Sequence, residues 1–148
     1  DAYHFTAPRP DARCATEAIR LALNEASFKS NEKIYINAHG TSTPLNDKTE
    51  TMAIKQALGE SDARKAAISS TKSMIGHALG AAVALELIFC ALTINEGIVT
   101  PTINLIQPDP ECDLDYTPNN SRDFKADIAI SNSFGFGGQN ACVAIRKI

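Results

Sequence analysis

The stretch that decides the fold is a short apolar run that passes through a histidine-glycine pair into a helix start: Lys33-Ile34-Tyr35-Ile36-Asn37-Ala38-His39-Gly40-Thr41-Ser42-Thr43-Pro44. The β-branched and aromatic residues of 33–38 predict a β-strand. Thr43 followed by Pro44 is typical of a helix N-cap and first turn, and this helix is expected to end at Gly59. A strand that leads into a helix is the repeating unit of α/β proteins.

A second histidine-glycine pair follows the same pattern. Residues 67–70 predict a strand, an apolar helix is expected over 78–95, and the segment between them reads Ser70-Thr71-Lys72-Ser73-Met74-Ile75-Gly76-His77. In open α/β sheets the loops after the strands collect the chemistry, and a glycine lets the backbone approach a ligand closely. Only three histidines are present, so His39 and His77 are candidates for one functional site.

The remaining segments complete an α/β pattern. We expect an amphipathic helix over residues 11–26, a short strand over 114–117, and a final hairpin of strands 128–133 and 141–146. The helix over 78–95 is hydrophobic nearly all round, so other elements should cover it on most sides. The order of elements predicts a three-layer α/β unit with a mixed sheet flanked by helices and a C-terminal hairpin.

Composition narrows the possible functions. The 148 residues, 44% apolar and 21% charged, suit one globular domain over 1–148, and the net charge of −3 without basic runs argues against a nucleic-acid partner. The apolar run near residue 78 is short for a bilayer and contains Glu86, so we expect no membrane span. No signal peptide is visible, and the missing initiating Met suggests a piece of a longer protein.

Four cysteines lack the spacing of a metal or redox motif: Cys14, Cys90, Cys112 and Cys142. They are interpreted as reduced thiols in a cytoplasmic compartment, each an ordinary core or surface residue, and no metal is expected.

Three loops rich in glycine could converge on one site, and each brings a distinctive side chain. His77, at the start of the apolar helix, would feel the positive end of the helix dipole, which opposes protonation; alternatively it only caps the helix. Glu86 is the sole charge of that helix, so it either pairs with Lys72 or faces solvent. The loop around Phe136 contains Gly135, Gly137 and Gly138. It could aim a backbone N–H at a carbonyl, or it could be a simple hairpin turn.

Taken together, these segments resemble the C-terminal half of the 3-oxoacyl-(acyl carrier protein) synthases, the condensing enzymes of fatty-acid synthesis. The resemblance rests on the two histidine segments and on three further stretches: Pro101-Thr102-Ile103-Asn104-Leu105, Cys112-Asp113-Leu114-Asp115 and Asn132-Ser133-Phe134-Gly135-Phe136-Gly137-Gly138. The opening Asp1-Ala2-Tyr3-His4 and the Cys112 stretch are more similar to synthase II than to synthase I.

The resemblance implies a thiolase-like fold of two similar halves and a decarboxylative Claisen condensation of an acyl-enzyme with malonyl-(acyl carrier protein). By similarity, His39 and His77 would bind the malonyl thioester carbonyl, and Lys72, held by Glu86, would support them. Thr41 and Thr43 would contact the pantetheine arm. Phe136 would gate the acyl pocket, and its N–H would form half of an oxyanion hole.

The implied partners are acyl carrier protein with acyl and malonyl thioesters, the N-terminal half of the same synthase, and a second copy in a homodimer; no cofactor is implied. The family's nucleophilic cysteine sits at a helix N-terminus in the other half, and none of the four cysteines here fits that setting. The chain alone is therefore expected to be inactive. The alternatives are half of a polyketide ketosynthase or its chain-length partner, and a non-catalytic thioester-binding module.

Overall fold

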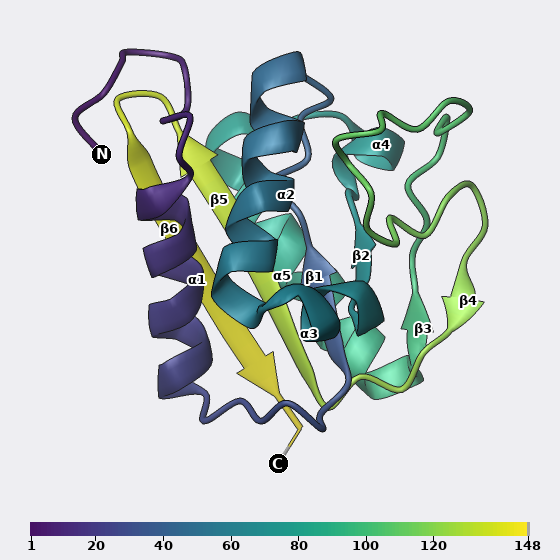
Figure 1. Ribbon diagram of the computed structural model, residues 1–148. Coiled ribbons are helices and arrows are strands. Elements are labelled where there is room, and N and C mark those ends of the chain that lie inside the picture. The colour runs from purple at the N-terminus through teal and green to yellow at the C-terminus, as the bar shows by residue number, and fades with distance from the viewer. Residues whose placement is uncertain (148) are drawn as a thin grey trace.

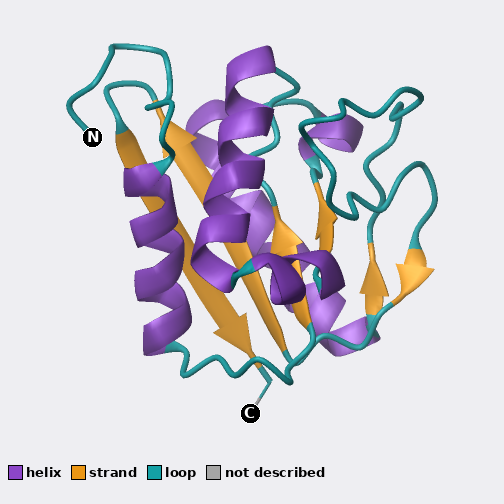
Figure 2. Ribbon diagram, in the orientation of Figure 1, coloured by secondary structure: helices purple, strands orange, loops and turns teal. Residues whose placement is uncertain are grey.

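A mixed four-stranded β-sheet lies between two layers of helices in the computed structural model, which describes residues 1–147 (Figures 1 and 2). The strand order is β2-β1-β5-β6, with bounds β1 Ile34–Asn37, β2 Ala67–Ser69, β5 Ile128–Gly135 and β6 Gln139–Arg146. Strand β1 is parallel to β2 and β5, whereas β6 runs antiparallel to β5. The predicted α/β architecture with its mixed sheet and C-terminal hairpin is confirmed.

The helices divide between the two faces of the sheet. On one face lie α1 (Arg13–Glu25) and α2 (Pro44–Leu58), and on the other lies α5 (Ala82–Glu96) (Figure 1). The predicted end of α2 at Gly59 is confirmed, but a short helix that was not predicted, α3 (Glu60–Lys65), begins directly after it. The two-sided cover explains why β1 and β2 are buried along their whole length.

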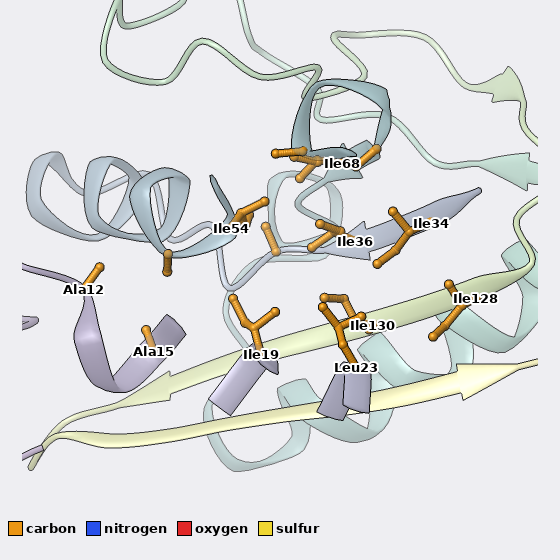
Figure 3. Packing of buried hydrophobic residues seen from close by; sticks show 14 residues of the cluster. Ala12, Ala15, Ile19, Leu23, Ile34, Ile36, Ile54, Ile68, Ile128 and Ile130 are labelled. Atoms are coloured by element: carbon orange, nitrogen blue, oxygen red, sulfur yellow. The ribbon is translucent and has the colours of Figure 1, made fainter. Parts of the chain in front are cut away.

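The larger core lies between the sheet and the face covered by α1 and α2 (Figure 3). Ile19 and Leu23 are four residues apart, so both point from one side of α1 toward Ile36 and Ile130 on the central strands. Ile54 brings α2 into the same cluster. The isoleucines of this cluster are almost fully buried, and their branched side chains adopt few rotamers. Their packing holds β1, and with it the start of the loop that follows β1, against α1 and α2.

Helix α5 covers the sheet on one side only, and the expectation that it would be covered on most sides is wrong for this chain. Its buried residues are the polar and small ones, namely Ala82, Glu86, Cys90 and Thr93. Leu85, Ile88 and Leu92 point away from the sheet and are 37%, 57% and 50% exposed. The segment Leu79–Glu96 is long and apolar enough to cross a membrane by length and composition. Its buried Glu86 and its packing against β5 identify it here as a sheet-covering helix.

Two other predictions need correction. The expected helix over 78–95 is split into a single 3₁₀ turn, η1 (Leu79–Ala81), followed by α5. The expected strand over 114–117 does not form: Asp115 accepts one backbone hydrogen bond from Ile68, at 3.0 Å, and the extended pairing fails there. Instead, β3 (Ile98–Val99) and β4 (Arg122–Asp123) make a separate two-stranded sheet.

Candidate active site

Loops at the carboxyl ends of the parallel strands bring the two predicted histidines together. His39 lies just after β1, and His77 follows α4 (Lys72–Ile75), the four-residue helix that comes after β2. The centroids of the two imidazole rings are 5.7 Å apart, and the ring planes are nearly perpendicular, at 86°. Because β1 and β2 are neighbouring parallel strands, the loops that follow them meet at the same edge of the sheet.

A buried carboxylate that the sequence analysis missed holds the backbone around His39. Glu50, in the second turn of α2, accepts the N–H of His39 at 2.8 Å and that of Gly40 at 2.9 Å. The side-chain amide of Asn132, on β5, donates to the same carboxylate at 3.1 Å. Burial raises the pKa of Glu50, and these three donors oppose the rise. The burial of Glu50 could have been inferred from its spacing, because it lies one helical turn before Ile54 and so on the same buried face of α2.

The imidazole of His39 is buried and electrostatically held in its neutral form. Burial is the main cause that lowers its pKa to about 4, and the neighbouring charges of Lys72 and His77 add to the effect. Among the described residues, Nδ1 of His39 has no hydrogen-bond partner. A neutral ring of this kind can donate one hydrogen bond to an oxygen that becomes negative during a reaction.

The predicted ion pair between Lys72 and Glu86 is present. Lys72, at the start of α4, donates through Nζ to Oε1 of Glu86 on α5, and both side chains are almost fully buried. Burial raises the pKa of Glu86, while the Lys72 ammonium acts in the opposite direction. The pair fixes the Lys72 ammonium near His39, because Lys72 is anchored on α4 and its partner Glu86 on α5.

His77 lies in a more open setting than His39. It is exposed, and η1 separates it from the start of α5, so it does not sit at the N-terminus of that helix as predicted. Its Nδ1 accepts the backbone N–H of Leu79 at 3.0 Å. This bond leaves Nε2 as the protonated nitrogen of the neutral ring, so the ring can donate outward from the protein backbone.

Thr41 and Thr43 line a cavity of about 630 Å³ together with Lys72 and His77. Thr43 precedes α2 as predicted, but its hydroxyl does not bond to the helix N-terminus. It instead shares a hydrogen bond of 3.0 Å with the hydroxyl of Thr41. Both threonines therefore lie on the wall of the cavity that Lys72 and His77 also line.

The hairpin brings an aromatic residue that was not predicted next to His39. Phe134, on β5, lies against His39 with ring centroids 5.7 Å apart. Phe136 is at the hairpin tip, where it is 78% exposed and does not line the cavity beside His77. The predicted strand end at residue 133 needs correction, because β5 extends to Gly135 and includes Phe134.

The N-terminal segment packs directly on the hairpin tip. The N–H of Gly137 donates to the carbonyl of Phe5 at 2.7 Å, and a Cβ placed on Gly138 would lie only 1.8 Å from the carbonyl oxygen of Asp1. Gly138 thus permits the close approach of another backbone. Gly135 has no such constraint, since a Cβ there would make ordinary contacts.

Three of the four cysteines lack the properties of an activated nucleophile. Burial raises the pKa of Cys90 and of Cys142 to about 12. The pKa of Cys112 is also raised, mainly by burial and then by Asp109. A thiol with a raised pKa carries little thiolate at neutral pH.

Residues 1–106 match the family described as "Beta-ketoacyl synthase, C-terminal domain". The 3-oxoacyl-[acyl-carrier-protein] synthase 2 of Synechocystis is 58% identical over 99% of this chain, and that of Staphylococcus aureus strain COL is 48% identical over 99%. The chain spans about a third of these relatives, 35% of each.

Solved structures with the same fold cover the whole chain. A beta-ketoacyl synthase from Burkholderia phymatum superposes with a TM-score of 0.90 at 38% identity, and the chain covers 35% of it. A type II polyketide ketosynthase, solved in complex with its acyl-carrier protein and bound to the hexaketide, superposes with a TM-score of 0.94 at 42% identity, with 36% of it covered.

Proposed function

The chain belongs to the beta-ketoacyl synthase family, with a thiolase-like fold, and from this premise we propose that it is the C-terminal half of a fatty-acid condensing enzyme. The proposed reaction joins an acyl-enzyme to malonyl-(acyl carrier protein) with loss of CO₂. The acyl group would be carried by a cysteine outside this chain. The observation that carries the proposal is the pair of adjacent imidazoles, with His39 buried and neutral and a fixed lysine charge beside it.

In the proposed mechanism the two histidines bind the oxygen of the malonyl thioester carbonyl. When the bond between the α-carbon and the carboxylate breaks, CO₂ leaves and the electron pair passes into the thioester as an enolate. Hydrogen bonds from His39 and His77 would stabilise the negative oxygen, and the low dielectric around His39 strengthens them.

The enolate carbon then attacks the carbonyl of the acyl-enzyme. A new carbon-carbon bond forms, the cysteine thiolate leaves, and it takes up one proton to regenerate the thiol. In this step the N–H of Phe136 would help to bind the oxyanion of the acyl group, and its side chain would gate the pocket. Its exposed position at a glycine-rich tip supports a movable element.

Lys72 is proposed as an electrostatic support, because Glu86 holds its ammonium in place. The positive charge favours the neutral form of His39 and the developing enolate. Thr41 and Thr43 would contact the pantetheine arm, in line with their place on the cavity wall.

The proposed partners are an acyl carrier protein, the N-terminal half of the same synthase and a second copy of the whole enzyme, in the cytoplasm. The apolar face of α5, with Leu85, Ile88 and Leu92 exposed, supports a covering N-terminal half. The ketosynthase solved with an acyl-carrier protein supports the carrier as partner.

A polyketide ketosynthase is the second candidate, and the structural similarity to one such enzyme at 42% identity favours it over a non-catalytic module. His39, His77 and Lys72 are all retained, which argues against a non-condensing chain-length partner.

The proposal is tested with the full-length protein and with this chain alone. We expect the full-length protein to form an acyl-enzyme and to release CO₂ from malonyl-(acyl carrier protein), and His77→Ala to reduce CO₂ release sharply. The chain alone should do neither. An acyl-enzyme mapped to one of its four cysteines, together with ketoacyl product, would contradict this division of the site. Near-normal turnover of His77→Ala would remove His77 from the mechanism.

A further inference from the structure

The hydroxyl of Ser70 links the two histidine loops by a part-buried hydrogen bond. It lies immediately after β2 and two residues before Lys72. Its hydroxyl donates to the carbonyl oxygen of Gly40 at 2.7 Å. Gly40 directly follows His39, so this bond joins the loop of one histidine to the segment that carries the lysine and the other histidine.

The glycine after His39 is shaped for this contact. Gly40 has a φ of +39°, and a Cβ built there would lie 2.6 Å from Cβ and 2.7 Å from Oγ of Ser70. Any side chain at position 40 would therefore displace the serine. The glycine of this histidine-glycine pair serves an approach between two parts of the protein, and not only an approach to a ligand.

Ser70 is itself fixed from two further directions. Its backbone N–H donates to Oγ1 of Thr102 at 3.0 Å, and its carbonyl accepts the hydroxyl of Ser73 at 2.8 Å. The next residue, Thr71, shares a hydrogen bond of 3.3 Å with the buried side chain of Asn37, at the end of β1. A donor with so little freedom holds its acceptor at a defined position.

We propose that Ser70 is a positioning residue of the condensing site, whose hydroxyl sets the distance of His39 from Lys72 and His77. The inference rests on the proposed function for its catalytic meaning. Its structural part, the placement of the His39 ring beside a buried positive charge, can be measured separately. The titratable groups around His39 are Lys72 and His77 near the ring and Glu50 at its backbone.

The test compares Ser70→Ala with Thr16→Val in the full-length protein. Thr16, on α1, donates its hydroxyl to Oε1 of Gln56 at 2.9 Å and bonds to neither Gly40 nor Ser70, so it is the matched control. Two quantities are measured: the rate of CO₂ release from malonyl-(acyl carrier protein), and the titration midpoint of His39 by NMR of ¹³C-histidine, assigned with His39→Gln.

We expect Ser70→Ala to lower kcat about 10- to 100-fold with little change in KM, since small displacements of a reacting group have effects of this size. The His39 midpoint should rise toward the ordinary histidine value, because a looser loop admits water and moves the ring away from Lys72. Thr16→Val should change neither quantity by more than about twofold.

A Ser70→Ala protein with the wild-type midpoint and kcat would overturn the inference, as would equal shifts in Thr16→Val. If Ser70→Ala does not fold, Ser70→Cys, which keeps a weaker donor, must still raise the midpoint. If the wild-type protein releases no CO₂, the proposed function fails, while the NMR midpoints still decide whether Ser70 positions His39.

Discussion

The turn that carries His39 and the turn that carries His77 hold the same residue type in different ways. The backbone around His39 is bonded to Glu50 on one side and to Ser70 on the other, and the ring is buried. His77 is exposed, and its ring accepts one hydrogen bond, from the N–H of Leu79 within the same turn. The backbone of His39 is thus held by contacts within this chain from two sides, whereas His77 has no comparable contacts among residues 1–147.

Among the variants that test this difference between the two turns, Lys72→Met should cause the largest loss of stability. Removing one partner of a buried ion pair leaves Glu86 as an unpaired buried carboxylate, which typically costs about 3–5 kcal/mol. The pKa of His39 should rise as well, because a positive neighbour is lost. Denaturant unfolding of the full-length protein measures the first effect.

The double variant Lys72→Met/Glu86→Leu is the control for that experiment. It removes both charges and should recover most of the stability, though not the activity. Equal stability of the double and single variants would show that the pair does not stabilise the fold.

Glu50→Ala should be the next largest change, and it acts on the His39 turn alone. It leaves the N–H groups of His39 and Gly40 without an acceptor, at about 1–3 kcal/mol for each buried group. Glu50→Gln keeps one acceptor oxygen and should lose about half as much. Thermal unfolding and CO₂ release of both variants are the measurements, and an unaffected Glu50→Ala protein would refute the role of this carboxylate.

The pH dependence of stability should also report on His39. Its pKa is about 4 in the folded protein and about 6.5 in an unfolded chain. The unfolded state therefore binds the proton first as pH falls, so stability is complete above pH ~6.5 and declines toward pH ~4, by about 3 kcal/mol. His39→Gln should remove this part of the pH dependence in unfolding curves measured from pH 4 to 7. Thr16→Val should retain it, and an unchanged slope in His39→Gln would contradict the assignment.

The smallest effect should be the difference in stability between alanine variants of the two glycines beside the histidines, Gly40 and Gly76. Gly40→Ala combines a positive φ with a collision against Ser70, whereas Gly76→Ala has a φ of +76° and no atom within 4 Å of the new Cβ. We expect Gly76→Ala to cost about 1–3 kcal/mol from backbone strain alone, because φ +76° with ψ 178° is a conformation that essentially only glycine adopts. Gly40→Ala should cost roughly 1–2 kcal/mol more. Equal shifts in melting temperature would show that the Ser70 contact adjusts without cost.

The local features were readable because they depend on neighbouring residues. The apolar run before His39 and the Thr43-Pro44 pair specified a strand and a helix start, and both are observed. The lone Glu86 of an apolar helix predicted an ion pair, since a buried carboxylate requires a cation, and Lys72 provides it.

Features that depend on distant contacts were missed. Glu50 stands among charged residues of α2 and reads as a surface residue until α2 packs on the sheet. The contact of Phe134 with His39 was not predicted, because the length of β5 is set by its pairing with β6, which the sequence does not reveal. Helix α5 was expected to be buried on most sides, but its apolar face is exposed, because the side with Glu86 and Cys90 is the one that packs on the sheet.

By itself, the sequence determined the α/β order of elements, the two histidine loops and the Lys72–Glu86 pair, because periodicity, turn residues and unpaired charges are encoded locally. Only the tertiary structure decided that Glu50 and Ser70 form hydrogen bonds to the backbone of the His39 turn while His77 is exposed. Those contacts join residues 11 to 82 positions apart along the chain. The packing of α2 and β2 against β1 brings them together, and no local pattern specifies that distance.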